Sequence, residues 1–152
     1  MRYFEDLKVG DKFQTAKHEM TAEEIMAFAR QYDPQPFHTD PVTAQATFFG
    51  RLVASGWHTA AVSMRLMVQG EMELDGGVIG QGMESLRWPR PVLPGDCLRV
   101  VTEVEELRPA PARPDRGLIK LHCRTYNQSG KIVQDMVATL LVARRVVSRS
   151  VV

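Results

Sequence analysis

The sequence has few cysteines, almost no net charge and no long hydrophobic run. Its 152 residues include only two cysteines, Cys97 and Cys123, too few for a disulfide framework or a zinc ribbon. The 19 basic and 18 acidic residues leave a net charge of +1, without the basic excess typical of nucleic-acid-binding proteins. No segment reaches the roughly 18 consecutive apolar residues that a membrane-spanning helix needs. We therefore expect a protein that binds neither nucleic acid nor membrane.

The overall composition is that of an ordinary folded domain. Hydrophobic residues make up 44% of the chain and charged residues 24%, which argues against disorder. The length fits a single domain over residues 1–152 with a sizeable core, and no repeat or linker divides it. Charged residues interrupt the N-terminal segment every few positions, unlike a secretory signal peptide, so we expect a cytoplasmic location.

Helix signals lie in the first half of the chain. Thr21 and Glu24 have the spacing of a capping box, and apolar residues then recur at helical intervals. Pro34 disfavours helical geometry at the residue before it, so the pattern predicts a helix over residues 21–32. Three prolines in residues 33–41 indicate a stiff, extended segment.

Two further helices are expected after this segment. An Asp-Pro pair predicts a short helix over about residues 42–48. A longer one is predicted over about residues 55–68, with Ser55 as its N-cap and a glycine just beyond its end. Because its apolar residues occupy most faces, we expect this second helix to be buried.

The second half of the chain is typical of β-structure. In residues 97–107, apolar and polar side chains alternate, which is typical of a strand with one buried face. Four strands are expected in all, over residues 78–88, 97–107, 118–126 and 132–142, with a hairpin turn at 127–131 and an exposed loop at 108–117. Helices early and antiparallel strands late predict an α+β fold, with a sheet wrapped round the buried helix.

Asp33 and His38 are the strongest candidates for a pair of catalytic residues. They lie five residues apart on the proline-stiffened segment that follows the first helix. A carboxylate and an imidazole held together can share one water molecule, one polarising it while the other accepts or returns a proton. The alternative is that Asp33 is an ordinary helix-end residue and His38 an ordinary loop histidine.

Gly56 is a second candidate, at the first turn of the long buried helix. The first amides of a helix have no intrahelical acceptor, and a glycine lets a ligand approach them closely, so this end can hold a developing negative charge. The alternative is a glycine required only for packing. His58 and Ser63, further along the same helix, are interpreted as packing or local hydrogen-bonding residues. No spacing typical of a metal site or of a dinucleotide-binding loop is present.

These segments together resemble the MaoC-like dehydratase family, the (R)-specific enoyl-CoA hydratases of hotdog fold. The opening residues 3–11 (YFEDLKVGD) are similar to the start of the family's domain. Residues 28–41 (FARQYDPQPFHTDP) resemble its hydratase motif, with Gln35 where the family usually has Asn. Residues 49–56 (FGRLVASG) and 90–96 (RPVLPGD) resemble the segments that lead into the central helix and the next strand.

The resemblance implies a role for each candidate residue. Asp33 and His38 would bind the catalytic water, and the Gly56 amide would hold the thioester carbonyl. It also implies a hotdog fold, an acyl-CoA thioester as substrate, and a homodimer or larger homo-oligomer. No metal or redox cofactor is expected, because the thioester itself acidifies the α-position, and coenzyme A enters only as part of the substrate.

The function expected from the sequence is reversible hydration of a trans-2-enoyl-CoA to a 3-hydroxyacyl-CoA. Two alternatives remain open at this point. One is a hotdog acyl-CoA thioesterase, because the same fold also supports hydrolysis. The other is a non-catalytic module that binds acyl-CoA.

Overall fold

The computed structural model describes residues 1–145; the last part of the expected domain, residues 146–152, lies outside the described residues. The helices are α1 (Ala22–Tyr32), α2 (Pro36–Thr39), α3 (Pro41–Ala44) and α4 (Gly56–Val68), preceded by a 3-10 turn at Phe4–Asp6. The strands are β1 (Lys12–Gln14), β2 (His18–Glu19), β3 (Ile79–Arg87), β4 (Cys97–Pro109), β5 (Arg116–Tyr126) and β6 (Ile132–Ala143). The α+β prediction is confirmed.

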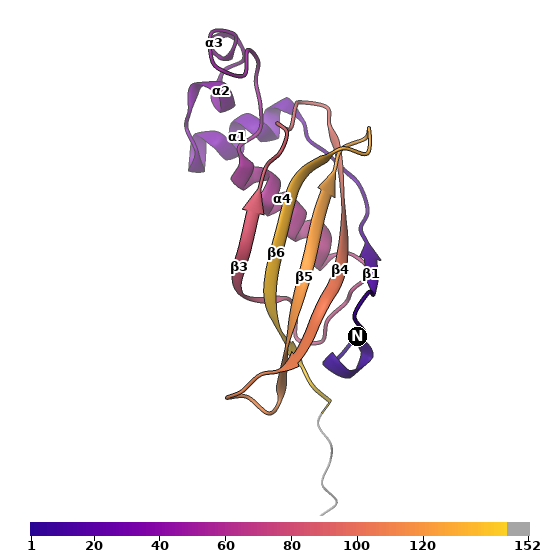
Figure 1. The fold of residues 1–152 in the computed structure, drawn as a ribbon. Coiled ribbons are helices and arrows are strands. Elements are labelled where there is room, and N and C mark those ends of the chain that lie inside the picture. The colour runs from indigo at the N-terminus through magenta and orange to yellow at the C-terminus, as the bar shows by residue number, and fades with distance from the viewer. Residues whose placement is uncertain (146–152) are drawn as a thin grey trace, which may run out of the picture.

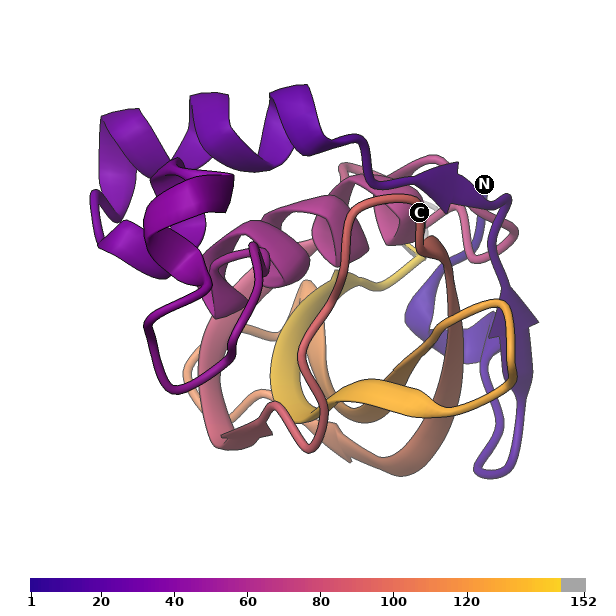
Figure 2. The same ribbon diagram turned by 90° about the horizontal axis from the view of Figure 1, so that it is seen from above.

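All strands pair antiparallel in one sheet, in the order β1-β4-β5-β6-β3, with the short β2 pairing with β4 (Figure 1). The view in Figure 2 shows the sheet curving round α4, while α1 lies on the side of α4 away from the sheet. The expected sheet wrapped round a helix is therefore present. β3 is the last strand of the order, so one of its edges has no partner strand among the described residues.

The alternation predicted for the second strand is confirmed. Along β4, Leu98, Val100, Thr102 and Val104 are all buried, and the residues between them are not fully buried. Valines 100 and 104 join the main core with Leu66 and Met67 of α4. Because side chains in a strand point alternately to opposite faces, this pattern turns one face of β4 toward the helix.

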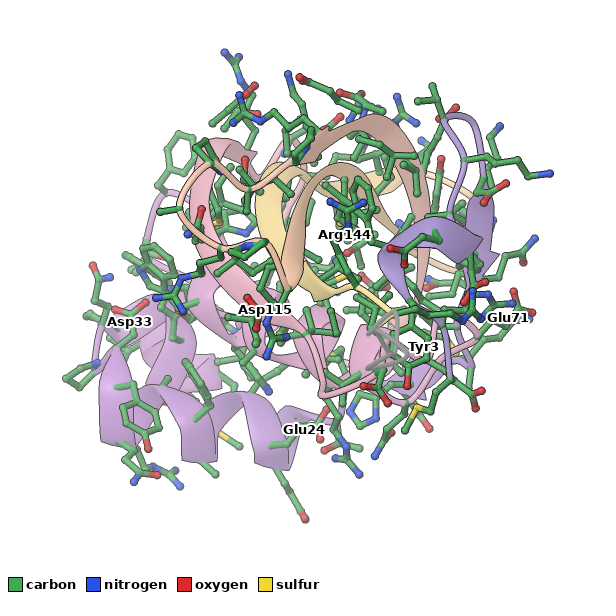
Figure 3. The ribbon with its side chains drawn as sticks, turned by 90° about the horizontal axis from the view of Figure 1, so that it is seen from below. Tyr3, Glu24, Asp33, Glu71, Asp115 and Arg144 are labelled. Atoms are coloured by element: carbon green, nitrogen blue, oxygen red, sulfur yellow. The ribbon has the colours of Figure 1, made fainter. Side chains whose placement is uncertain are left out.

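The first helix begins and ends where predicted. The Thr21 hydroxyl accepts a hydrogen bond from the Glu24 amide, and the Glu24 carboxylate accepts one from the Thr21 amide. The helix ends at Tyr32, and Asp33 follows as its C-cap residue. In Figure 3, Glu24 and Asp33 mark the two ends of α1, so this helix positions the candidate carboxylate.

Four local predictions are wrong. The short helix expected over residues 42–48 begins at Pro41 and ends at Ala44. Residues 36–39 form the helical turn α2 and not an extended segment, because Pro36 occupies its first position, where the missing N–H costs nothing. α4 is not buried all round: Trp57, Met64 and Val68 are exposed on one side of it. The loop expected over 108–117 is shorter, since β4 and β5 continue pairing to Pro109 and Gly117.

The short strands β1 and β2 were not predicted from the sequence. They span only three and two residues, too short for a periodic pattern to be visible. Among the described residues, no helix combines the length and the apolar character needed to cross a lipid bilayer.

Candidate active site

The fold brings Asp33 and His38 together. Asp33 caps the C-terminal end of α1, and His38 lies on α2, one turn further along the chain. Nε2 of His38 is 3.3 Å from Oδ2 of Asp33. The carboxylate and the imidazole are therefore close enough to act on the same water molecule or the same proton.

Two side chains donate hydrogen bonds to the Asp33 carboxylate. Nε2 of Gln35 donates to Oδ1 at 2.6 Å, and the hydroxyl of Ser55 donates to Oδ2 at 2.7 Å. Burial by itself raises the pKa of the Asp33 carboxyl, but these hydrogen bonds and the neighbouring His38 outweigh it, so that the pKa lies below its ordinary value. Asp33 is thus held in the ionised form.

The imidazole of His38 is oriented by the segment that leads into α4. Its Nδ1 lies 2.7 Å from the carbonyl oxygen of Val53, and because a carbonyl only accepts, Nδ1 carries the hydrogen. The Val53 amide in turn donates to the carbonyl of Phe37, at 2.9 Å. His38 is 6% exposed, so its ring has little freedom to turn. Its Nε2 is left to face Asp33.

A pocket of about 420 Å³ opens beside His38. Its walls include His38 and Gly56 together with Phe49, Trp88 and Arg90. Asp33 is not part of this wall, but its side chain keeps 17% of its surface exposed. Water therefore reaches the carboxylate from outside, while a ligand in the pocket contacts the imidazole.

Gly56 is the first residue of α4, as predicted, and it lies in the wall of this pocket. Its N–H has no hydrogen-bond acceptor among residues 1–145, as is usual for the first turn of a helix. The space beside its Cα, however, is not open. A Cβ added there would lie 2.6 Å from two ring carbons of Trp88. Packing against the indole therefore requires glycine here, as in the alternative interpretation, and the approach of a ligand to the Gly56 N–H stays a prediction.

The two further residues of α4 singled out in the sequence, His58 and Ser63, have structural contacts, as interpreted from it. The ring of His58 stacks on Phe28 of α1, with centroids 4.7 Å apart, and burial lowers its pKa. The hydroxyl of Ser63 is 2.7 Å from that of Thr125 on β5. Neither contact involves the Asp33–His38 pair.

Sequence reasoning missed three residues of the site. Ser55 was assigned as a helix cap, yet its hydroxyl makes no cap hydrogen bond and serves Asp33 instead. Gln35 was noted only as a departure from the family pattern, and Trp88 was not singled out. The proximity of Gln35 to Asp33 in the chain was the one available signal, since Ser55 and Trp88 reach the site only through folding.

Methionine side chains line a second, apolar pocket of about 400 Å³. It lies between α4 and the strands, and its lining includes Met64, Met67, Met72 and Met83. Buried Cys123 also borders it, and desolvation raises the pKa of that thiol to about 12. A thiol with this pKa stays protonated near neutral pH and is a poor nucleophile. In the part of the chain described by the structure, no group of three potential metal ligands is found.

The pair at the pocket can bind and polarise a water molecule. An ionised carboxylate and the lone pair of a neutral imidazole are both acceptors, so one water can donate a hydrogen to each. A helix amide without an acceptor lies in the same pocket wall. Such an arrangement suits addition of water next to a carbonyl group on which negative charge develops.

Comparisons with known proteins identify the family to which the chain is related. A MaoC-like dehydratase from Rhodospirillum rubrum, whose crystal structure is known, is 46% identical, with a TM-score of 0.92 over 97% of this chain and 100% of that one. The (R)-specific enoyl-CoA hydratase of Aeromonas caviae is 33% identical over 130 residues, 84% of this chain and 90% of the relative.

The fold is confirmed by a third protein. A double-hotdog protein from Mycobacterium tuberculosis is 20% identical and covers 95% of this chain and 44% of its own, with a TM-score of 0.75. At that identity the likeness concerns the fold alone, and it supports the hotdog architecture expected above. The model of the MaoC like domain matches residues 6–114. The chain therefore belongs to the MaoC-like dehydratase family.

Proposed function

We propose that the protein adds water reversibly across the α,β double bond of a trans-2-enoyl-CoA, giving a 3-hydroxyacyl-CoA. The observation that carries the proposal is the Asp33–His38 pair at 3.3 Å, placed beside a pocket that also contains the N-terminus of α4. The relationship to a hydratase from Aeromonas caviae supports the same reaction class.

The hydrogen bonds that Asp33 and His38 make support a different chemical role for each of the two residues. The carboxylate of Asp33 has a lowered pKa and is therefore a weak base, so it orients the water and stabilises a positive charge on the imidazole. The proton is transferred at Nε2 of His38, since Nδ1 is committed to the Val53 carbonyl. Holding both groups in place removes much of the entropic cost of bringing water to the substrate.

The proton taken from the water is returned to the substrate by the same histidine, so the reaction needs no other proton donor. The water oxygen bonds to the β-carbon while its proton passes to Nε2 of His38. The π electrons move toward the thioester carbonyl and give an enolate-like oxygen, which the Gly56 N–H stabilises. The imidazolium returns its proton to the α-carbon, which restores the uncharged imidazole beside the ionised carboxylate of Asp33. Because the thioester itself stabilises the enolate, the proposed reaction uses no metal or redox cofactor, and coenzyme A is only part of the substrate.

We also propose that the protein acts as a homodimer or larger assembly of identical chains. The edge strand β3 is exposed over much of its length, and Met83 on it is 54% exposed. The neighbouring face of α4 exposes Trp57 and Met64. An unpaired edge strand beside apolar side chains favours association with a second copy. We propose in addition that the protein is located in the cytoplasm, as expected from the sequence.

Incubation with crotonyl-CoA tests the proposal. Hydration removes the conjugated double bond, so its absorbance falls while no thiol is released. Release of free thiol would show a thioesterase instead, and binding without either change would show a non-catalytic module. A reaction mixture without the protein serves as the control for spontaneous reaction.

A further inference from the structure

Trp88 forms a wall of the pocket and is held in place from within the core. Its Nε1–H donates to Oε1 of Gln134 on β6, at 2.9 Å. Gln134 is 1% exposed, so its amide has no freedom to follow a moving indole. The ring of Trp57 packs edge-on against Trp88, with centroids 5.2 Å apart at 80°. The position of the indole is thus determined by β6 on one side and by α4 on the other.

The indole also lies directly against the first residue of α4. Two of its ring carbons occupy the space 2.6 Å from where a Cβ of Gly56 would lie. The ring therefore borders the helix terminus whose N–H is proposed to hold the thioester carbonyl. An acyl group attached to that carbonyl begins within reach of Trp88.

The other aromatic residues of the pocket are less restrained. Phe48 is 95% exposed and Phe49 is 36% exposed, and both belong to the segment between α3 and α4. The rings of Phe48 and Phe49 pack edge-on against each other, and the ring of Phe49 also packs against Phe37. Trp88 is itself 39% exposed, so burial does not distinguish it from Phe49. What restrains Trp88 is its hydrogen bond to the buried Gln134, since a phenylalanine ring has no group that could make one. The fixed wall of the pocket is Trp88.

We propose that Trp88 is the specificity-determining residue of this site, limiting the acyl group to a short chain by closing the pocket beside Gly56. The inference rests on the proposed function, because it assumes that the ligand is an acyl thioester. Gln134 acts as a positioning residue, through its hydrogen bond to the indole.

A kinetic comparison tests the size limit. The ratio of kcat/KM for trans-2-hexenoyl-CoA to that for crotonyl-CoA is measured in the wild type, Trp88→Phe and Trp88→Leu. We expect the ratio to rise at least about tenfold in Trp88→Leu, since accommodating one or two methylenes changes discrimination by that order. Trp88→Phe keeps a ring on Gly56 and should lie between the two. Tyr126→Phe is the control, because Tyr126 lies on β5 and does not line the pocket, and its ratio should stay unchanged.

A second measurement does not depend on turnover. The chain has two tryptophans, so Trp57→Phe leaves Trp88 as the only indole fluorophore, and Trp88→Phe leaves only Trp57. Butyryl-CoA has no double bond to hydrate and serves as the probe, with free coenzyme A as its control. We expect butyryl-CoA to change the emission of Trp88 more than free coenzyme A does. The emission of Trp57 should respond equally little to both.

The outcomes separate this inference from the proposed function. If the wild type hydrates crotonyl-CoA but Trp88→Leu, folded by circular dichroism, keeps the wild-type ratio, the specificity role is wrong and the hydratase proposal stands. The same conclusion follows if butyryl-CoA changes the emission of Trp88 no more than free coenzyme A does. If the wild type neither hydrates crotonyl-CoA nor binds butyryl-CoA, both proposals are wrong.

Discussion

The hydroxyl of Ser55 donates a 2.7 Å hydrogen bond to Oδ2 of Asp33, linking the residue before α4 to the residue after α1. Ser55 is fully buried, so its hydroxyl is shielded from water, while the Asp33 carboxylate keeps 17% of its side-chain surface exposed. A hydrogen bond to a charged group typically contributes more than one between neutral groups, about 1.5–3 kcal/mol. The contact therefore both orients the carboxylate and favours its ionised form.

Replacing Asp33 by Asn should abolish most of the hydration activity while the protein stays folded. Asn is nearly isosteric with Asp but carries no charge to orient the water or to stabilise an imidazolium. Groups in this role contribute about 10²–10⁴-fold, and we expect a loss in kcat/KM for crotonyl-CoA of that order. Asp40→Asn is the matched control, because Asp40 caps α3 and Asn caps helices equally well. Wild-type turnover in Asp33→Asn would rule out the assignment.

Removing His38 should reveal that it works as a unit with Asp33. His38→Ala is expected to lower kcat/KM by a factor similar to that for Asp33→Asn. Because both residues act on one water molecule, the double variant should lose far less than the product of the two single losses. The double-mutant cycle is completed by measuring kcat/KM for crotonyl-CoA in the wild type, the two single variants and the double variant. Simple multiplication of the single losses would mean that the two side chains act independently.

Ser55→Ala should shift the acid side of the pH–rate profile upward. The hydrogen bond from Ser55 helps to lower the pKa of Asp33, so its loss moves that pKa up and Asp33 becomes protonated at higher pH. The variant should lose kcat/KM earlier than the wild type as the pH falls. Ser63→Ala is the control, since Ser63 is buried on the same helix but pairs with Thr125. Identical acid limbs in Ser55→Ala and the wild type would contradict the role given to this contact.

The same pKa shift affects stability in acid. The folded-state pKa of Asp33 is below its ordinary value of 3.8, so ionised Asp33 stabilises the folded state above that pH. This contribution is lost as the pH falls through the lowered value. It should be smaller in Ser55→Ala, whose stability is therefore expected to change less over that interval. Urea unfolding at a series of acidic pH values measures the difference.

A methyl group at position 56 should be harmful mainly because of Trp88. Gly56→Ala places a Cβ against the indole ring, so both the melting temperature and the rate of hydration should fall. In a Trp88→Leu background the methyl has more room, and its effect on the melting temperature should be smaller. The expected coupling, about 0.5–3 kcal/mol, is typical of side chains in contact. An equal loss of stability in both backgrounds would show that the indole is not the obstacle.

Light scattering of the purified protein should give at least twice the mass of one chain. Met83→Lys adds a charge to the exposed edge strand β3 and should weaken the assembly, lowering the measured mass at micromolar concentration. Val9→Lys is the control, because Val9 is also exposed but lies outside β3 and α4. A stable wild-type monomer would contradict the proposed association.

Interactions between near neighbours in the chain were determined by the sequence alone. The capping box of Thr21 and Glu24 is confirmed, as is the alternation along β4, because each depends on residues a few positions apart. Asp33 and His38 were also identified as a pair from their closeness in the chain, but the helical turn α2, and not the extended segment predicted, brings them within 3.3 Å. The resemblance to the family added the hotdog fold.

Contacts between distant segments were decided only by the tertiary structure. Ser55 had the sequence signature of a helix cap, but folding brings it to Asp33, and a hydroxyl buried beside a carboxylate gains more from that charge than from a backbone amide. Trp88 had no signature at all, and its place against Gly56 depends on how β3 and β6 pack on α4. Side-chain packing of this kind depends on the three-dimensional arrangement of whole elements, which local patterns do not encode.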